Sequence, residues 1–249
     1  MLRCSSPSII FRILFYGEAD LIVTFFSQDA GLLRGFAHNA RRSRRRFGGR
    51  LEPLAEVDLA WSDASRGGLL TLQEAQMRFL HLGLRRDLEV MTLASYGCEL
   101  VEALCAEGEP YPEIFTMLQA FLGHLEQFPA SPEVRLLLEL RLLSLCGYAP
   151  RLSACCRCGA PLTAETVHVD IPGGALCPFC AKSALKGRAV SLVTLGTLFR
   201  SLQVPFTVFD GFHFGTQTLQ EARLILTPLV RHHLRFVPKS LALMGTSEP

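Results

Sequence analysis

Residues 31–54 read GLLRGFAHNARRSRRRFGGRLEPL, and they join two apolar segments through a run of arginines. Similar short segments, apolar and in part β-branched or aromatic, occur throughout the first ~75 residues, and glycine-containing turns separate them. Five strands in so short a stretch favour a small barrel of the OB type over a sandwich of seven or more strands. We expect these strands at Ser8–Phe15, Leu21–Phe26, Leu32–Ala37, Glu52–Trp61 and Leu69–Leu72.

The arginine run carries most of the charge asymmetry of the chain. The formal net charge of the 249 residues is only +2, yet no Asp or Glu interrupts the segment from residue 34 to residue 50. Because guanidinium groups match phosphate oxygens and also stack on bases, the run predicts a polyanion-binding loop between the third and fourth strands. A solvated basic loop without a partner is the alternative, but a position inside a strand-rich segment favours a binding site. The seven arginines are Arg34, Arg41, Arg42, Arg44, Arg45, Arg46 and Arg50.

Two phenylalanines flank the arginine run and are candidates for stacking on bases. Phe36 lies at the end of a predicted strand, where we expect it to belong to the core. Phe47 precedes Gly48 and Gly49, and either a core position or an exposed one is compatible with this context. Phe47 is therefore the aromatic residue that we include, with the seven arginines, among the candidate nucleic-acid-binding residues.

Beyond the predicted barrel, from Glu74 to Gly147, apolar residues recur at the spacing of helices. A helix at Ser131–Cys146 has Ser131 as a candidate N-cap and Pro132 at its first position. We therefore expect an α+β protein with several domains, an N-terminal five-stranded OB-type barrel followed by an α-helical bundle. Its expected parts are a DNA-binding barrel at 1–75, a helical domain at 76–152 and 183–249, and a cysteine-rich insertion at 153–182. The remaining helices are expected at 113–127, about 192–202 and about 217–237.

Four of the nine cysteines form two CxxC pairs, Cys155 with Cys158 and Cys177 with Cys180, and 18 residues separate the pairs. This spacing is typical of a structural zinc site with four thiolate ligands, a zinc ribbon. A two-residue gap lets a tight turn direct both sulfur atoms at one ion, and a glycine after Cys158 can continue such a turn in the left-handed conformation. Cys156 could replace Cys155, although its one-residue gap to Cys158 is geometrically poorer.

Other uses of the cysteines fit the spacing less well. A redox dithiol needs only one CxxC pair, and iron–sulfur clusters use different spacings. A catalytic zinc keeps one position open, whereas four thiolates fill the tetrahedron. His168 lies between the pairs, and we expect it to face solvent or to form a hydrogen bond. The remaining cysteines are expected to be small apolar side chains: Cys4, Cys98, Cys105 and Cys146.

Several protein classes are excluded by what the sequence lacks. It contains no GxxxxGK[ST], GxSxG or HExxH motif, so we expect neither a nucleotide cofactor nor the commoner hydrolase chemistry. No stretch of 18 apolar residues occurs, and Arg12 interrupts the apolar segment Ile9–Phe15, so we expect no membrane span and no secretion signal. Nine cysteines in such a chain indicate thiols or metal ligands of an intracellular protein.

Several further motifs follow one another along nearly the whole chain. They are YGEADLIV at 16–23, GLL at 31–33, ARRSRRRFG at 40–48, LEPL at 51–54, GYAP at 147–150, the two CxxC elements, and His233–Leu234 followed by Lys239–Ser240. In this order they resemble the RecO family of bacterial DNA repair and recombination-mediator proteins. The chain departs from the family pattern at His38–Asn39, where lysine and glycine are common, but Asn39 tolerates the same left-handed backbone. It also has Arg45 where a serine is common in the loop.

The resemblance implies a non-enzymatic mediator that binds single- and double-stranded DNA through the basic loop of the barrel and anneals complementary strands. It also implies that the protein remodels single-strand-binding protein on DNA and, together with RecR, helps to load RecA. One structural zinc ion, a cytoplasmic location at the nucleoid and no membrane partner complete the expectation.

Two other functional classes stay open on the residues alone. A zinc-ribbon adaptor would recruit proteins through their acidic tails, which would bind to the arginine run. An enzyme acting on nucleic acid would need clustered carboxylates or an open metal site. The nearest acidic residues alternate along a predicted strand and resemble a solvated face: Glu52, Glu56, Asp58 and Asp63.

Overall fold

The computed structural model describes residues 3–66, 68–184 and 187–244, and the chain forms two compact units. The first unit comprises residues 1–129 and 238–249, and the second comprises residues 130–237. The first unit thus includes the two helices that follow the barrel, which the sequence grouped with the helical domain. The functional division into 1–75, 153–182 and a two-part helical domain stays a prediction.

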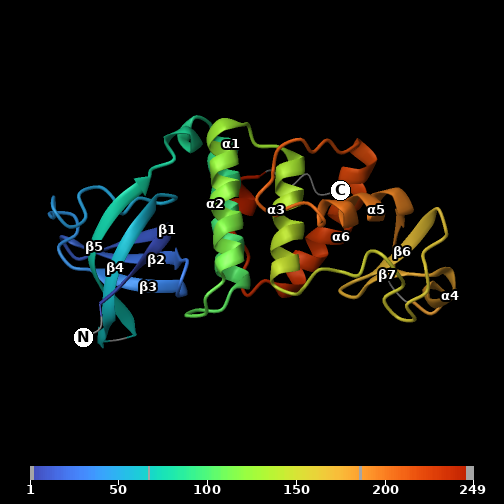
Figure 1. The fold of residues 1–249 in the computed structure, drawn as a ribbon, viewed down its shortest axis with the longest axis horizontal. Helices are drawn as coiled ribbons and strands as arrows, with labels where there is room; N and C mark the ends of the chain where they lie inside the picture. Colours follow the sequence, from blue (N-terminus) through green and yellow to red (C-terminus); the bar gives the residue numbers. More distant parts are fainter. Residues whose placement is uncertain (1–2, 67, 185–186, 245–249) are drawn as a thin grey trace. The chain divides into compact units, whose positions relative to one another are not determined.

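The five strands at the N-terminus close into a barrel, which confirms the architecture expected from the sequence (Figure 1). Neighbouring strands are antiparallel except β3 and β5, which run parallel where Gly35 pairs with Leu70. In barrel order the strands are β1 (Arg3–Tyr16), β2 (Asp20–Ser27), β3 (Gly31–Ala37), β5 (Leu69–Phe79) and β4 (Glu56–Arg66).

The strand β5 is longer than expected, because it continues through Glu74–Phe79, which the sequence assigned to the beginning of the helical region. This part of β5 pairs with β4, with Val57 opposite Met77 and Leu59 opposite Ala75. Ala75 is buried in the barrel core. Long-range pairing therefore overrides the helix-like spacing of the apolar residues in this segment.

The interior of the barrel is filled by side chains that alternate along each strand, as the two-residue period of a strand requires. On β2, Leu21, Val23 and Phe25 point inward, and the ring of Phe25 lies 5.6 Å from that of Trp61. Each fully buried side chain of this size stabilises the fold by about 1.5–3 kcal/mol. The opposite face of the strands is consequently the outer surface of the barrel, to which the two helices and solvent have access.

Two helices and two short 3-10 turns complete the first unit. Asp87 caps the first helix by accepting a hydrogen bond from the backbone N–H of Val90 at 2.7 Å. The ring of Phe115 in the second helix lies 6.1 Å from that of Phe26 on the outer face of β2, so this helix covers part of the barrel. The elements are η1 (Leu82–Arg85), α1 (Leu88–Leu104), α2 (Pro112–Gln127) and η2 (Lys239–Ala242).

The second unit combines helices with a small antiparallel sheet of strand order β7-β6-β8 (Figure 1). Ser131 caps the first helix of this unit as expected, because its hydroxyl accepts from the backbone N–H of Val134 at 3.2 Å. The last helix ends at His233, four residues before the expected end. The elements are α3 (Pro132–Leu145), β6 (Thr166–Asp170), β7 (Gly174–Leu176), α4 (Pro178–Ala181), β8 (Arg188–Ser191), α5 (Leu192–Ser201) and α6 (Thr216–His233).

A buried arginine organises the segment between α5 and α6. Arg141 of α3 has no exposed surface, and its Nη1 donates hydrogen bonds to the carbonyl oxygens of Phe206 at 3.3 Å and Val208 at 2.6 Å. Its guanidinium also lies 4.9 Å from the ring centre of Phe209 and 5.2 Å from that of Phe212. Burial lowers the pKa of Arg141 to about 10, so the group stays charged at neutral pH. Arg141 thus holds a long loop against α3.

Within the described part of the chain, no helix has both the length and the apolar character needed to span a lipid bilayer.

Candidate nucleic-acid interface and metal centre

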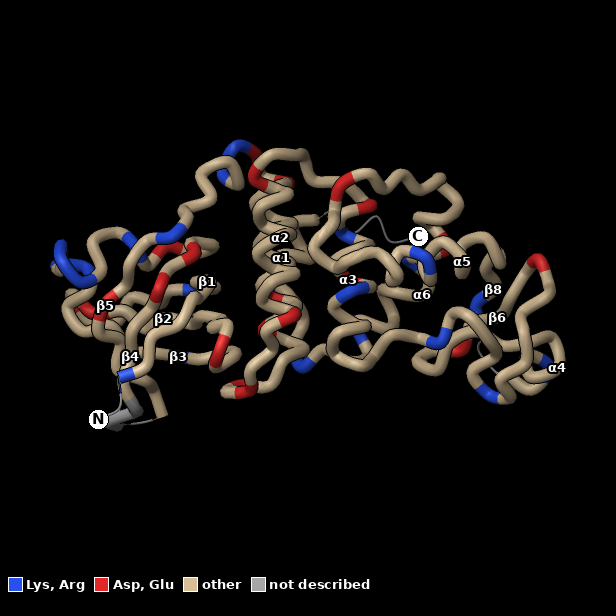
Figure 2. The backbone as a smooth tube through the Cα atoms, viewed as in Figure 1, with Lys and Arg blue, Asp and Glu red and all other residues tan. Residues whose placement is uncertain are grey.

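The segment that connects β3 to β4, residues 38–55, is a series of turns that we call the arginine loop. Figure 2, in which Lys and Arg are blue, shows basic positions of this loop gathered at the edge of the barrel. Asn39 has a left-handed backbone with φ of 53°, as expected from the sequence. Further along, the backbone N–H of Gly48 donates to the carbonyl oxygen of Ser43 at 2.8 Å. The loop is therefore folded upon itself rather than an extended tail.

Three of the candidate arginines carry unengaged guanidinium groups. In the described part of the chain, the side chains of Arg34, Arg44 and Arg45 have neither a hydrogen bond nor an ion pair, and all three are exposed. Arg34 belongs to β3, whereas Arg44 and Arg45 lie near the middle of the arginine loop. Each guanidinium has five N–H donors, so these residues offer their full capacity to an anion.

The other four arginines form hydrogen bonds that shape the loop and use few of their donors. Arg41 donates to the carbonyl oxygen of Glu18 at 2.9 Å, and Arg42 pairs with the exposed carboxylate of the same residue at 3.3 Å. Arg46 donates to the carbonyl oxygen of His38 at 2.8 Å. Since exposed ion pairs of this kind are worth about 0–1 kcal/mol, Glu18 neutralises little of the positive charge.

Arg50 is the most enclosed of the seven. Its Nη1 donates to the carbonyl oxygen of Arg45 at 3.0 Å, and its side chain is half-buried. A backbone hydrogen bond from Ala75 to Arg46, at 2.9 Å, fastens the same part of the loop to β5. Arg50 therefore supports the loop in this structure, while its remaining donors stay available.

Phe47 is buried in the barrel core, with 1 % of its surface exposed. It packs with Ala40 and Leu51 from either side of it in the same loop, and the guanidinium of Arg46 lies 5.2 Å from its ring centre. A base could stack on Phe47 only if the ring left the core, so in this conformation the residue anchors the loop. Phe36, expected in the core, is instead half-buried outside the barrel core.

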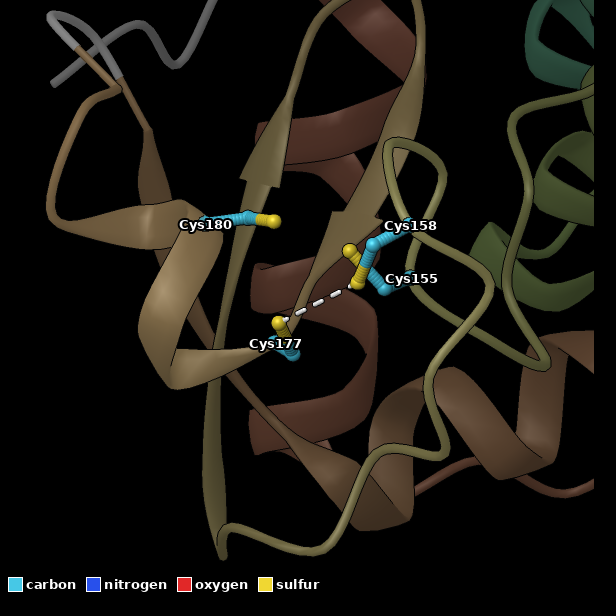
Figure 3. A group of neighbouring side chains, drawn as sticks. All are labelled: Cys155, Cys158, Cys177 and Cys180. Carbon is cyan, nitrogen blue, oxygen red and sulfur yellow. Dashed lines mark hydrogen bonds between the residues drawn. The ribbon is translucent and has the colours of Figure 1, made fainter.

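The structure brings together the sulfur atoms of Cys155, Cys158, Cys177 and Cys180, which we call the cysteine cluster (Figure 3). All four sulfur atoms lie within 4.8 Å of one another, and those of Cys158 and Cys177 are 3.7 Å apart. In a tetrahedral site with zinc–sulfur bonds of about 2.3 Å, neighbouring sulfurs lie about 3.8 Å apart. The cluster therefore fits a tetrahedral metal ion, and Cys156 is outside it.

Tight turns position each pair of cysteines. In the first turn, the N–H of Gly159 donates to the carbonyl oxygen of Cys155 at 2.9 Å, and Gly159 has the expected left-handed backbone with φ of 75°. Cys177 precedes α4, which carries Cys180, and the N–H of Ala181 donates to the carbonyl oxygen of Cys177 at 2.9 Å. Both turns leave the sulfur atoms on the inner side, as Figure 3 shows.

The electrostatics of the cluster favour one thiolate in the absence of a cation. Burial alone would raise the pKa of Cys155, but hydrogen bonds from the backbone of Cys177, Cys158 and Arg157 lower it to about 6. Burial and the neighbouring thiols raise the pKa of Cys180 to about 12. Further thiolates at such short distances require a compensating positive ion, and a bound divalent cation deprotonates its thiol ligands.

Arg157, which the sequence did not single out, braces the cluster from outside. Its Nη2 donates to the carboxylate of Asp170 on β6 at 2.9 Å, and its Nη1 donates to the hydroxyl of Ser183 at 3.1 Å. The residue thus links the first cysteine turn to the sheet and to the segment after α4. In the sequence, the only indication of this role was that Arg157 is a cation located between two predicted ligand cysteines.

The acidic residues near β4 are individually paired. Glu52 pairs with Arg85, and Asp58 lies 3.2 Å from Arg78. Burial alone would raise the pKa of Glu56, but hydrogen bonds, chiefly from His81, lower it. The side chain of Asp63 lies outside the described residues. Among the described side chains, the cysteine cluster is the one group of three or more His, Cys, Asp or Glu placed to hold a metal.

Comparison with known families agrees with both parts of this architecture. Residues 1–79 match the family model described as "Recombination protein O N terminal", and residues 85–242 match "Recombination protein O C terminal". The chain belongs to the RecO family. This confirms the resemblance seen in the sequence and, with it, the expectation of a non-enzymatic mediator.

Individual RecO proteins are similar over almost their full length, and all three described here are named DNA repair protein RecO. The protein from Syntrophotalea carbinolica is 46 % identical over 246 residues, which cover 98 % of this chain and 95 % of the relative. The one from Pelobacter propionicus is 36 % identical, covering 91 % and 89 %. The one from Geobacter sulfurreducens is 33 % identical, covering 100 % and 99 %.

Proposed function

We propose that this RecO protein binds single- and double-stranded DNA through phosphate contacts of the arginine loop and of Arg34 on the adjoining strand. The observation that carries the proposal is that the guanidinium groups of Arg34, Arg44 and Arg45 are exposed and have no partner among the described residues. Arg41, Arg42 and Arg46 add donors beside them. Binding of this kind releases counterions from the DNA and therefore weakens steeply with salt.

The same contacts explain how such a protein promotes annealing. Two complementary strands repel each other through their phosphates, and a dense group of arginines neutralises several phosphates at once. Phosphate contacts carry no sequence information, so pairing between the two strands decides which strands join. We therefore propose strand annealing with little preference for base sequence.

For the cysteine cluster we propose one structural zinc ion, held by Cys155, Cys158, Cys177 and Cys180. A tetrahedral set of four sulfur ligands is typical of zinc, and it leaves no open position for a substrate. When bound, the ion would cross-link the two cysteine turns and allow all four thiols to ionise. The chain contributes the fixed turns and the brace of Arg157 with Asp170.

The proposed partners follow from family membership. We propose that the protein acts on DNA coated with single-strand-binding protein and, together with RecR, helps to load RecA. Its place would then be the cytoplasm, at the nucleoid. An adaptor that binds acidic protein tails through the arginine loop is the alternative, because an exposed carboxylate, that of Glu18, already pairs with Arg42 in this structure.

Salt-dependent binding to a single-stranded oligonucleotide tests the role of the loop. If about five phosphates are engaged, the slope of log K against log salt is about −3.5 for the wild-type protein. The triple variant R34A/R44A/R45A should flatten this slope by about 2, since three phosphate contacts are lost. A matched control, R188A/R200A/R223A, removes three exposed arginines of the second unit and should leave the slope unchanged.

The outcomes separate the proposal from its alternatives. An unchanged slope in the loop variant would remove the loop from DNA binding. An equal change in both triple variants would indicate a general effect of net charge. Tighter binding of an acidic peptide than of the oligonucleotide, at the same salt concentration, would favour the adaptor.

A further inference from the structure

An exposed apolar strip lies on the outside of the barrel beside the arginine loop. The pairing of β1, β2 and β3 places Leu14, Ile22 and Phe36 in one row across the three strands. Leu21 and Val23, the neighbours of Ile22 on β2, belong to the barrel core, so this row faces outward. The next row toward the end of β1 begins at Tyr16.

Among the described residues of the first unit, none covers the exposed side chains of this strip. Leu14 is 60 % exposed and Tyr16 is 56 % exposed, whereas Phe26 on the same face of β2 is buried beneath α2. Contiguous apolar side chains that are exposed and rimmed by polar residues mark a binding surface.

The aromatic rings of the strip form a group, Tyr16, Phe36 and His38, that we call the base platform. The rings of Tyr16 and Phe36 lie 5.7 Å apart in an edge-to-face arrangement of 78°. Those of Phe36 and His38 lie 6.3 Å apart and are inclined by only 22°. Asp20 fixes the imidazole, because its Oδ1 lies 3.1 Å from Nδ1 of His38. The rings are thus held by each other and by the strand register.

Positive groups border the base platform on more than one side. Arg34 lies two residues before Phe36 on β3 and therefore on the same face, and its guanidinium is unengaged in the described chain. Arg46 donates to the carbonyl oxygen of His38. A DNA strand whose phosphates bind these arginines therefore brings its neighbouring bases onto the base platform.

We propose that Tyr16, Phe36 and His38 stack on the unpaired bases of single-stranded DNA whose phosphates the arginines hold. This inference rests on the proposed DNA binding and adds the chemical group that is recognised. Every base has a flat π face, so stacking tolerates any sequence, and the outer face of an OB-type barrel is a surface that accommodates single strands. Bases in a duplex are stacked on one another and cannot reach the rings.

The proposal gives the platform a role that the arginine loop cannot perform. Phosphates are present in both single- and double-stranded DNA, so the arginines alone hold either form. The platform adds affinity only for the single strand. It also replaces Phe47, whose ring is buried, as the source of stacking.

The test compares an oligo(dT) strand with an abasic strand of the same length, which keeps the phosphates and lacks the bases. For the wild-type protein we expect tighter binding of oligo(dT). The Y16A variant should lose about 5-fold or more of its oligo(dT) affinity, the effect of one stacking contact, and keep its affinity for the abasic strand. F128A, which removes an exposed aromatic ring of the same unit, is the matched control and should change neither.

A second variant gives a direct readout that does not depend on a loss of affinity. The chain has one tryptophan, Trp61, which is 5 % exposed in the barrel core. In Y16W, the added indole should be quenched by oligo(dT) and not by the abasic strand, while the wild-type signal stays constant.

The results separate this inference from the DNA binding on which it rests. If Y16A loses affinity equally for both strands, or for neither, and Y16W is not quenched, the platform does not contact bases. If the wild-type protein binds neither strand, the proposed function itself fails. If R34A/R44A/R45A loses binding while Y16A retains all of it, phosphate binding stands and the base platform is overturned.

Discussion

The arginine loop and the cysteine cluster are both built on tight turns, yet they direct their side chains in opposite ways. The loop buries one ring, Phe47, and exposes its cations, whereas the cluster encloses its sulfur atoms within 4.8 Å of one another. Exposed cations contribute little to folding, and enclosed ligands contribute little to surface recognition. Substitutions of the exposed arginines Arg44 and Arg45 should therefore change DNA binding at constant stability, and substitutions in the cluster should change stability first.

The cysteine cluster should give the largest effect of any single substitution. We expect C155S to lose the metal and to lower the melting temperature of the second unit, because coordination energy is folding energy in such sites. C156S is the matched control, since this cysteine is adjacent in sequence and outside the cluster. Metal content per chain and thermal unfolding, with and without a chelator, measure both effects.

The contrast between the loop and the cluster is contradicted if C155S and C156S have the same metal content and melting temperature. Equal metal loss in C155S and C156S would mean that the ligand set differs from the one proposed. A protein that keeps its melting temperature after complete removal of the metal would show that the ion does not stabilise the fold.

The next largest effect should be the difference in stability between substitutions of two arginines, one buried (Arg141) and one exposed (Arg44). R141A removes a fully buried guanidinium and leaves two carbonyl oxygens and two aromatic rings without their partner, which should cost about 2–5 kcal/mol of unfolding free energy. R44A removes an exposed guanidinium and should stay within about 0.5 kcal/mol of the wild-type value. Urea unfolding of both variants gives the comparison.

R141M serves as the control for volume, because methionine fills much of the space without the charge. A smaller loss in R141M than in R141A would assign part of the effect to packing. Similar stabilities of R141A and R44A would contradict the anchoring role described for Arg141.

Acidification should have a smaller effect, to which Glu221 in the second unit contributes. Burial alone would raise the pKa of Glu221, but hydrogen bonds from Thr194, Gln217 and Ser191 lower it to about 2. A depressed carboxyl pKa stabilises the fold above its unfolded value, and this contribution is lost as the pH falls from about 4.5 to about 2. In E221Q, unfolding free energy should therefore fall less steeply over this range than in the wild-type protein.

The measurement is urea unfolding at several pH values between 5 and about 2, where the linkage acts. R44A, whose substitution touches no carboxylate, should keep the wild-type steepness. An identical pH dependence in E221Q and the wild-type protein would show that the hydrogen bonds of Glu221 do not distinguish the folded from the unfolded state.

The features that depended on short-range spacing were predictable from the sequence. Each CxxC pair directs its two sulfur atoms to one place as expected, because each pair is set by its own turn. The five strands and the position of the arginine loop between β3 and β4 are likewise confirmed, since glycine-containing turns delimit the strands.

The features that depended on distant parts of the chain could not be predicted from the sequence. The segment Glu74–Phe79 is a strand because β4 lies beside it, and no local pattern reports that partner. Phe47 is buried because the loop folds back over the end of the barrel. Alternation along β1 could have placed Tyr16 with Leu14, but only the register with β2 and β3 brings both to Phe36.

The turn η2 has a consequence for folding during synthesis. Ser240 donates both its backbone N–H and its hydroxyl to Glu99 of α1, at 2.9 and 2.6 Å, so residues near the end of the chain complete the unit that contains its beginning. On the ribosome, Ser240 is added 141 residues after Glu99, so the two hydrogen bonds between them form late relative to α1. Truncation shortly before Ser240 would thus remove a contact of the first unit and leave the second unit, residues 130–237, with all of its residues.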